Sequence, residues 1–153
     1  MTNYEALLDE ACGKGLIVKE KPLRAHDGRI KGKRIAIRQD IETTAEKACV
    51  LAEELGHHET SVGDILDMND IHNRKQERQA RFNGYQRLIG LVQLVDAYEY
   101  GCQSRYEIAE YLDVTEMYLQ ECIDCYRDKY GVSVKVGEYE IVFIPYLAVY
   151  KTI

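Results

Sequence analysis

The chain has 153 residues, of which 46% are hydrophobic and 30% are charged, and its formal net charge is -6. This composition is typical of a globular domain with its own core and excludes a disordered or fibrous chain. The acidic balance argues against a general binder of nucleic acid or anionic membranes, so we expect no direct binding to nucleic acid, although a local basic patch stays open.

No apolar run reaches the roughly 18 to 20 residues of a membrane span, and the first residues lack the basic and apolar regions of a signal peptide. We therefore expect a cytoplasmic protein without a membrane segment. The 5 cysteines are odd in number and lie in apolar patterns, which favours buried thiols over disulfides. Cys122 and Cys125 form a Cys-x-x-Cys pair, but no second pair completes a zinc site, so a structural role is favoured over metal or redox chemistry.

The first predicted elements are a helix and a few strands. Thr2 and Glu5 have the spacing of a capping box, and apolar residues follow at helical intervals until Gly13. Two stretches rich in β-formers, 16–18 and 35–37, flank turn sequences that contain glycine. We expect two or three antiparallel strands here, the last of them near residues 32–38.

Basic residues are concentrated in this strand region. A solvated strand face explains them, and the docking of a charged partner is the alternative that the pattern leaves open. The residues concerned are Lys19, Lys21, Arg24, Arg29, Lys31, Lys33, Arg34 and Arg38.

A second capping box, Thr43 with Glu46, predicts an amphipathic helix over residues 43–58. This helix ends in the sequence EELGHH at 53–58. The negative end of the helix dipole lies there, and it favours a bound cation or a protonated imidazole.

The C-terminal half is predicted to be mainly helical. After a loop with one helical turn at 59–73, a long helix is expected from about 74 to 100, with a kink or break at Gly84 or Gly90. Two short helices then meet at Asp113-Val114 and resemble a helix-turn-helix, but acidic residues dominate the second one, which favours packing over DNA binding. A hairpin with its turn at Gly137 ends the pattern.

Together these elements predict one α+β domain over residues 1–153, with a small antiparallel sheet packed on several helices. Its parts are an N-terminal helix with strands (1–42), the helix at 43–58, a helical part (73–130) and a C-terminal β-hairpin (132–150).

Carboxylates and imidazoles crowd one turn of the helix at 43–58. Glu53 and His57 stand four residues apart on one face, with Glu54 beside them. In the zinc peptidase motif HExxH, two histidines at this spacing bind the metal and the glutamate next to the first activates water. Here Glu53 takes the place of the first histidine. One helical turn cannot supply three ligands, and Glu77, in a segment suited to close helix packing at Ala80, is the best-placed further carboxylate.

Simpler interpretations exist for each of these residues. Glu53 and Glu54 suit a solvent-facing helix surface, and His57 alone suits a helix cap. Glu54 with His58 forms a rival pair at the same spacing, in which Glu54 would lose its role as a base. Further carboxylates that turn or capping roles explain equally well are Asp64, Asp67 and Asp70, and we assign no role to His26 and His72.

The sequence around these residues resembles a known family. Residues 51–57 resemble the active-site helix of the ImmA/IrrE metallopeptidases, whose usual form is HELGH, and Glu77-x-x-Ala80-x-x-Asn83 resembles their later helix, which supplies the third ligand. The resemblance extends over approximately residues 5–130. It implies a zincin-like α+β domain, often carried by phages or mobile elements, that acts on a partner transcriptional repressor.

The resemblance also implies roles for single residues. His57 and Glu77 would be metal ligands, Glu54 the general base on metal-bound water, and Glu53 stands where the family has its first histidine. Because a carboxylate ligates zinc at about 2.0 to 2.2 Å, a site of Glu53, His57 and Glu77 is feasible. Two anionic ligands weaken the metal as a Lewis acid, which predicts reduced activity or use of another divalent ion such as Mn²⁺ in place of Zn²⁺.

Two hypotheses about function follow. The first is a zinc-dependent endopeptidase that cleaves a helix-turn-helix repressor or a similar regulator. The second is a weak or inactive member of the same fold that regulates its partner by binding. Glu53 separates the two, because it decides whether the site holds a metal.

Overall fold

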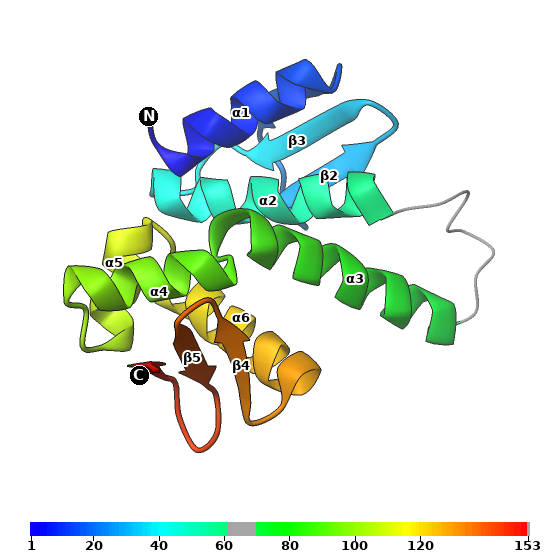
Figure 1. The fold of residues 1–153 in the computed structure, drawn as a ribbon. Coiled ribbons are helices and arrows are strands. Elements are labelled where there is room, and N and C mark those ends of the chain that lie inside the picture. Colours follow the sequence, from blue (N-terminus) through cyan, green and yellow to red (C-terminus); the bar gives the residue numbers. More distant parts are fainter. Residues whose placement is uncertain (61–69, 153) are drawn as a thin grey trace. The chain divides into compact units, whose positions relative to one another are not determined.

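The chain folds into helices and two small sheets (Figure 1). The computed structural model describes residues 1–60 and 70–152, and only the backbone at 70–73. It divides into two compact units, Met1–Arg87 and Leu88–Ile153. The α+β class expected from the sequence is confirmed. No helix within the described ranges is long and apolar enough to cross a membrane.

The first unit begins with helix α1 (Asn3–Gly13), whose N-cap residue Thr2 accepts a hydrogen bond from the Glu5 N–H at 3.2 Å. Thr43 does the same for Glu46 at 3.1 Å at the start of the second helix, so both capping boxes place helix starts correctly. The further elements of this unit are β1 (Ile17–Lys21), β2 (Gly28–Lys31), β3 (Arg34–Arg38), α2 (Thr44–Thr60) and α3 (Asp70–Leu88).

The boundaries predicted for the loop at 59–73 are wrong at both ends, because the flanking helices extend into it. Helix α2 extends to Thr60 and α3 begins at Asp70, while the remaining residues, 61–69, lie outside the described ones. The first turns of α3 are rich in Arg, Lys, Gln and Glu, which form helices readily but give no apolar stripe. Apolar periodicity therefore could not detect where this helix begins.

The small sheet of the first unit is confirmed, but one pairing differs from the expectation. Strands β2 and β3 form an antiparallel hairpin, whereas β1 pairs with β3 in parallel, giving the order β1-β3-β2. Ile35 and Ile37 of β3 are 2% and 0% exposed, and β1 is mostly exposed. The most apolar strand, β3, takes the centre of the sheet, so β1 pairs with the edge of β3 that β2 leaves free. The chain reverses direction between β1 and β2 and again between β2 and β3, and β1 and β3 therefore run parallel.

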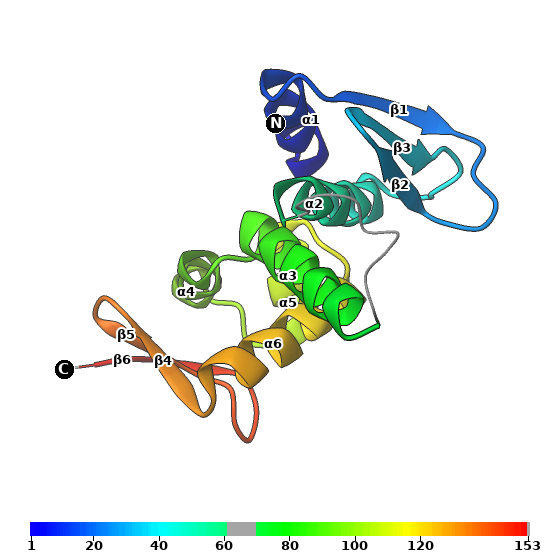
Figure 2. The same ribbon diagram turned by 90° about the vertical axis from the view of Figure 1, so that its right-hand side faces the viewer.

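Helix α2 is the central element of the first unit. Figures 1 and 2 show it between α3 on one side and α1 with the sheet on the other. Where α2 meets α3 the two backbones approach closely, because a Cβ atom added to Gly56 would lie 2.1 Å from the Ala80 carbonyl oxygen. The residues of α2 that are 0% exposed are Ala48, Leu51, Ala52 and Leu55.

The second unit starts with helices α4 (Leu91–Tyr100), α5 (Arg105–Leu112) and α6 (Glu116–Tyr130). The predicted break in the long helix lies at Gly90, the N-cap residue of α4, whereas Gly84 lies inside α3. The hydroxyls of Ser104 and Thr115 cap α5 and α6 by accepting backbone N–H groups at 3.1 Å.

The core of the second unit is organised around α6. The buried Tyr126 hydroxyl donates a hydrogen bond to the Ile89 carbonyl oxygen at 2.6 Å, and the Cys122 sulfur lies 3.8 Å from the same oxygen. Ile89 stands at the break between helices, where a carbonyl lacks a helical partner. Cys122 is 0% exposed, which supports the structural role favoured for it.

The predicted C-terminal hairpin is confirmed and is extended by one strand. Strands β4 (Ser133–Val136), β5 (Tyr139–Val142) and β6 (Ala148–Lys151) form an antiparallel sheet in that order. Gly137 adopts a φ of 59° in the turn between the first two strands, a conformation that suits glycine.

Candidate metal centre

Helix α2 presents Glu53 and His57 on the side that faces α3. Its apolar side is buried against α1 and the first sheet, and this packing sets the rotation of the helix. Gly56, which contacts α3, lies on the same side as Glu53 and His57. The side chains of Glu53 and His57 are 39% and 22% exposed, so both are half-buried and accessible to an ion from solvent.

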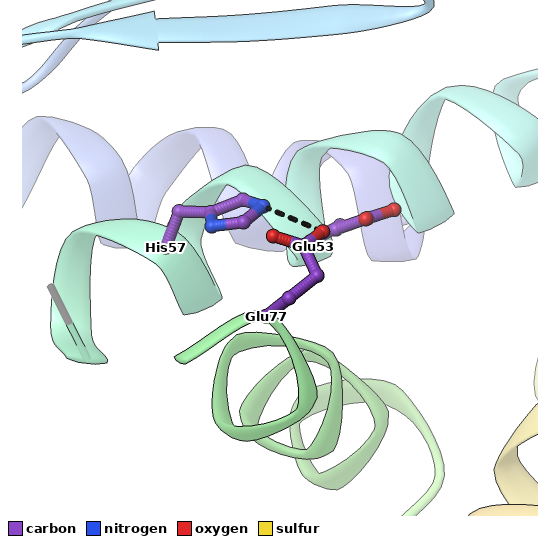
Figure 3. Close-up of side chains that lie close together, drawn as sticks. All are labelled: Glu53, His57 and Glu77. Carbon is purple, nitrogen blue, oxygen red and sulfur yellow. Dashed lines mark ion pairs between the residues drawn. The ribbon is translucent and has the colours of Figure 1, made fainter. Parts of the chain in front are cut away.

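Glu77 joins these two residues from α3 (Figure 3). His57 Nε2 lies 3.5 Å from Glu77 Oε1, and one ligand atom from each of Glu53, His57 and Glu77 lies within 4.8 Å of the others. The close approach at Gly56 brings α3 near enough for the short Glu77 side chain to reach His57. The structure thus brings together the three side chains that the sequence placed in one site.

The donor set fits a divalent cation. Ligand atoms at about 2.1 Å from an ion lie about 3.4 Å apart in tetrahedral geometry. The 3.5 Å separation of His57 Nε2 and Glu77 Oε1 matches this value. All three ligand atoms lie within 4.8 Å of one another, so a side-chain rotation is enough to bring them to the spacing that an ion requires. Two carboxylates with one imidazole offer a harder set of ligands than two histidines and a glutamate.

Glu54 lies beside this cluster and is buried. Its side chain turns towards the start of β2, where its Oε1 is 3.1 Å from the position of a Cβ atom at Gly28. Glu54 is 8% exposed, the only charged residue among the described ones to be buried. Burial, followed by the negative charges of Glu53 and Glu77, raises the pKa of Glu54 to about 7.

Arg81 is a member of the site that the sequence reasoning missed. Its Nε atom lies 3.7 Å from Glu53 Oε1 and 3.7 Å from Glu77 Oε1. Glu77 and Arg81 stand four residues apart on one helix, a spacing that in principle marks them as a pair. The contact between Arg81 and Glu53 joins two helices, and no pattern in the sequence predicts it. The same holds for the contact between Gly28 and Glu54.

The other candidate ligands stay outside this group. Within residues 1–60 and 74–152, no second set of three metal-ligating side chains converges, and His58 does not belong to the set that does. The converging set thus contains the pair of Glu53 and His57 and not the rival pair of Glu54 and His58. The side chains of Asp64, Asp67, Asp70 and His72 lie outside the described residues.

A half-buried imidazole with two carboxylates from two helices, next to a buried glutamate, resembles the His₂Glu sites of metal-dependent hydrolases, with a carboxylate in place of one histidine. A family comparison gives the class a name. The model of the Peptidase_M78 family, described as an IrrE N-terminal-like domain, matches residues 16–123, and the chain belongs to this family. No curated protein and no solved structure matches it.

The family match confirms the ImmA/IrrE resemblance inferred from the two helix motifs. It indicates a metallopeptidase-type hydrolase, for which a divalent metal and a protein substrate are implied. Among the residues that the structure describes, the group that could hold such an ion is Glu53, His57 and Glu77.

Proposed function

We propose that the chain is a metal-dependent endopeptidase whose ion is held by Glu53, His57 and Glu77. The observation that carries this proposal is the convergence of these three side chains from α2 and α3. A bound divalent ion supplies a Lewis acid that polarises the peptide carbonyl and lowers the pKa of water.

Glu54 is the proposed general base. Its carboxylate is close enough to Glu53 and Glu77 to be influenced by their charges, and it is shielded from solvent. A carboxylate whose pKa is near the working pH can accept a proton from the attacking water and later pass it to the leaving amine. The base role requires Glu54 to stay close to the ligand cluster, and contact with Gly28 limits its movement.

Zinc is the proposed ion, with Mn²⁺ or another divalent ion as the alternative. Glu53 adds a negative charge where the family has a neutral histidine, so the ion's charge is neutralised more fully and its effect on water is weaker. Oxygen-rich sites suit Mn²⁺ better than sites with two imidazoles do. We therefore expect slower hydrolysis with Zn²⁺ than a two-histidine site would give.

The proposed substrate is a partner transcriptional repressor or similar regulator, of the helix-turn-helix type. The support for this partner is the ImmA/IrrE relationship, and the chemistry of the site adds only that the substrate must reach a half-buried cluster. An extended segment or loop of the regulator would do so. Cytoplasmic action follows from such a target.

Metal binding is tested with matched variants of neighbouring histidines. Zn²⁺ and Mn²⁺ are added separately to chelator-treated protein, and thermal unfolding is recorded. We expect stabilisation of about 2.7 kcal/mol at an ion concentration one hundred times the Kd. His57→Ala should remove this effect and His58→Ala should keep it. Equal effects of both variants, or no stabilisation by either ion, would contradict the proposed site.

The catalytic part is tested with a purified helix-turn-helix repressor as substrate. Cleavage is followed by electrophoresis and mass spectrometry with Zn²⁺ or Mn²⁺ present. Glu54→Gln is expected to abolish cleavage while metal binding, measured by calorimetry, changes little. Glu53→His is expected to keep or raise zinc affinity, because it restores the two-histidine pair. Loss of metal together with cleavage in Glu54→Gln would refute the base role.

A second candidate function is control of a partner by binding without hydrolysis. The observation that favours it is Arg81, whose guanidinium lies 3.7 Å from both Glu53 and Glu77 and so already compensates their charge. In this case the chain should bind a regulator equally well with chelator and with metal. Metal-free and metal-loaded protein compared in one binding assay distinguish the two functions.

A further inference from the structure

The outer face of the first sheet carries a basic hollow. A depression of about 190 Å³ lies on strands β1, β3 and β2, away from α2. Ala36 of the central strand pairs with Lys19 on one side and Arg29 on the other, so a small side chain forms the floor between two cations. The basic residues that line the hollow are Lys19, Lys21, Arg29, Lys31 and Arg34.

No acidic side chain lines this hollow, and its five cations form no salt bridge with any described residue. Glu20, the acidic residue of β1, instead forms a salt bridge with Lys47 of α2 at 2.6 Å. Lys31 and Arg34 stand directly opposite each other across the hairpin, a like-charge pairing that destabilises a sheet unless an anion lies between them. All five cations are exposed. The face is therefore arranged for an anion that the chain itself does not supply.

The net charge of the chain does not argue against an anionic ligand at this face. Residues 1–87 contain 15 basic and 15 acidic residues, whereas residues 88–153 contain 5 basic and 11 acidic ones. The whole charge of -6 thus belongs to the second unit. The first unit is neutral overall, so its five exposed cations give the sheet face a local positive charge.

The dimensions of the face exceed those of a single phosphate. Three strands at about 4.8 Å spacing and four residues at about 3.3 Å rise give a basic area of about 10 by 13 Å. One strand of a duplex carries a phosphate about every 3.4 Å along the axis, so such a length presents about four. No aromatic ring lines the hollow, so unpaired bases would find no stacking platform.

We propose that this sheet face, formed by Lys19, Lys21, Arg29, Lys31 and Arg34, binds the phosphate backbone of duplex DNA without regard to sequence. The charge complementarity of five unpaired cations with a row of phosphates carries the proposal. The choice of DNA rests on the proposed function, because a transcriptional regulator is met on DNA. Binding there would concentrate the enzyme where its substrate is bound.

The test is fluorescence anisotropy of a labelled 20-base-pair duplex with the full chain at 20 to 200 mM salt. Four to five phosphate contacts predict a slope of about -4 for log K against log salt, since each contact contributes about -0.9. Lys19→Gln/Arg29→Gln/Arg34→Gln should raise the Kd more than about 30-fold at low salt and reduce the slope by about 3. Ala36→Glu, which removes no cation, should weaken binding at least tenfold.

The matched control is Arg74→Gln/Lys75→Gln/Lys135→Gln, which removes three exposed charges outside the hollow. It should bind the duplex like the parent chain. Absence of salt-dependent binding at 20 mM, or equal losses in the control, would overturn the proposal. A salt-sensitive dimer removed by the sheet-face substitutions would instead assign the face to a second copy of the chain.

The result is independent of the metal centre. Binding is measured in chelator with the Glu54→Gln variant as well as with the parent chain, and the two should agree. Failure of DNA binding would leave the peptidase proposal intact. Failure of hydrolysis would leave the binding measurement unaffected.

Discussion

Replacement of Glu54 by glutamine is expected to stabilise the metal-free protein in neutral and alkaline solution but not in acid. Burial, with the charges of Glu53 and Glu77, raises the pKa of Glu54 from its ordinary value of 4.5 to about 7. A carboxylate with a raised pKa in the folded state favours folding most when it is protonated, below about pH 4.5. This advantage is lost as the pH rises to about 7, because the folded protein must then hold a buried negative charge.

The size of the effect follows from the pKa. One pKa unit corresponds to about 1.4 kcal/mol, so the charged form of Glu54 costs the folded protein about 3 kcal/mol above pH 7. Glutamine has nearly the same shape and stays neutral at every pH. For a chain of this length, a gain of about 3 kcal/mol raises the Tm by about 6 to 12 °C.

The assay is thermal unfolding in chelator at pH 4.5, 6 and 8, with Glu42→Gln as the control at an exposed position. Glu54→Gln should match the parent chain at pH 4.5 and exceed it increasingly at pH 6 and 8, while Glu42→Gln should show no such trend. A difference that does not depend on pH would refute the account of Glu54 as a buried acid. Addition of Zn²⁺ at pH 8 should narrow the difference, because a cation beside Glu54 favours its charged form.

Further variants probe the packing and charge of the two units. Gly56→Ala should destabilise the fold by about 2 to 3 kcal/mol and weaken zinc binding measured by calorimetry, because its Cβ would lie 2.1 Å from the Ala80 carbonyl oxygen and push α3 away. Unchanged zinc affinity would show that α3 does not position the site. Arg81→Gln should tighten Zn²⁺ binding about fivefold by removing a nearby positive charge, and weaker binding would contradict this. Tyr126→Phe should cost about 1 to 3 kcal/mol in urea unfolding, since the buried Ile89 carbonyl loses its 2.6 Å hydrogen bond, and a cost near zero would argue against it.

Arg81 links the structure to the choice between the two functions. Glu53 and Glu77 bring two negative charges to the cluster, and Arg81 lies near both of them. An ion entering the site would have to tolerate this guanidinium or displace it. Since the Arg81 side chain is 56% exposed, displacement into solvent is cheap.

Helix starts were readable from the sequence because they depend on a few neighbouring residues. Thr2 and Thr43 cap helices where their spacing to Glu5 and Glu46 predicted it. The spacing of Glu53 and His57 on one helix face is equally local, since it follows from 3.6 residues per turn. The hairpin at Gly137 is another local feature, and it was found too.

The features that were missed depend on contacts between distant segments. The parallel pairing of β1 with β3 reflects competition among strands for the centre of the sheet, which no single strand encodes. The beginning of α3 was hidden because a polar, half-exposed helix has little apolar periodicity. The basic residues of the sheet were counted in the sequence, but their gathering round one hollow depends on strand order.

The amino-acid sequence alone was enough to place an imidazole and two glutamates on one helical turn and to predict, from a family resemblance, that such residues hold a metal. That Glu77 reaches them depends on the packing of distant segments, because it requires α2 and α3 to touch at Gly56 and Ala80. The tertiary structure decided that Glu54 is buried and that Arg81 lies against Glu53. Spacing along a chain determines which side chains share a helix face, whereas burial and charge compensation depend on what packs against that face.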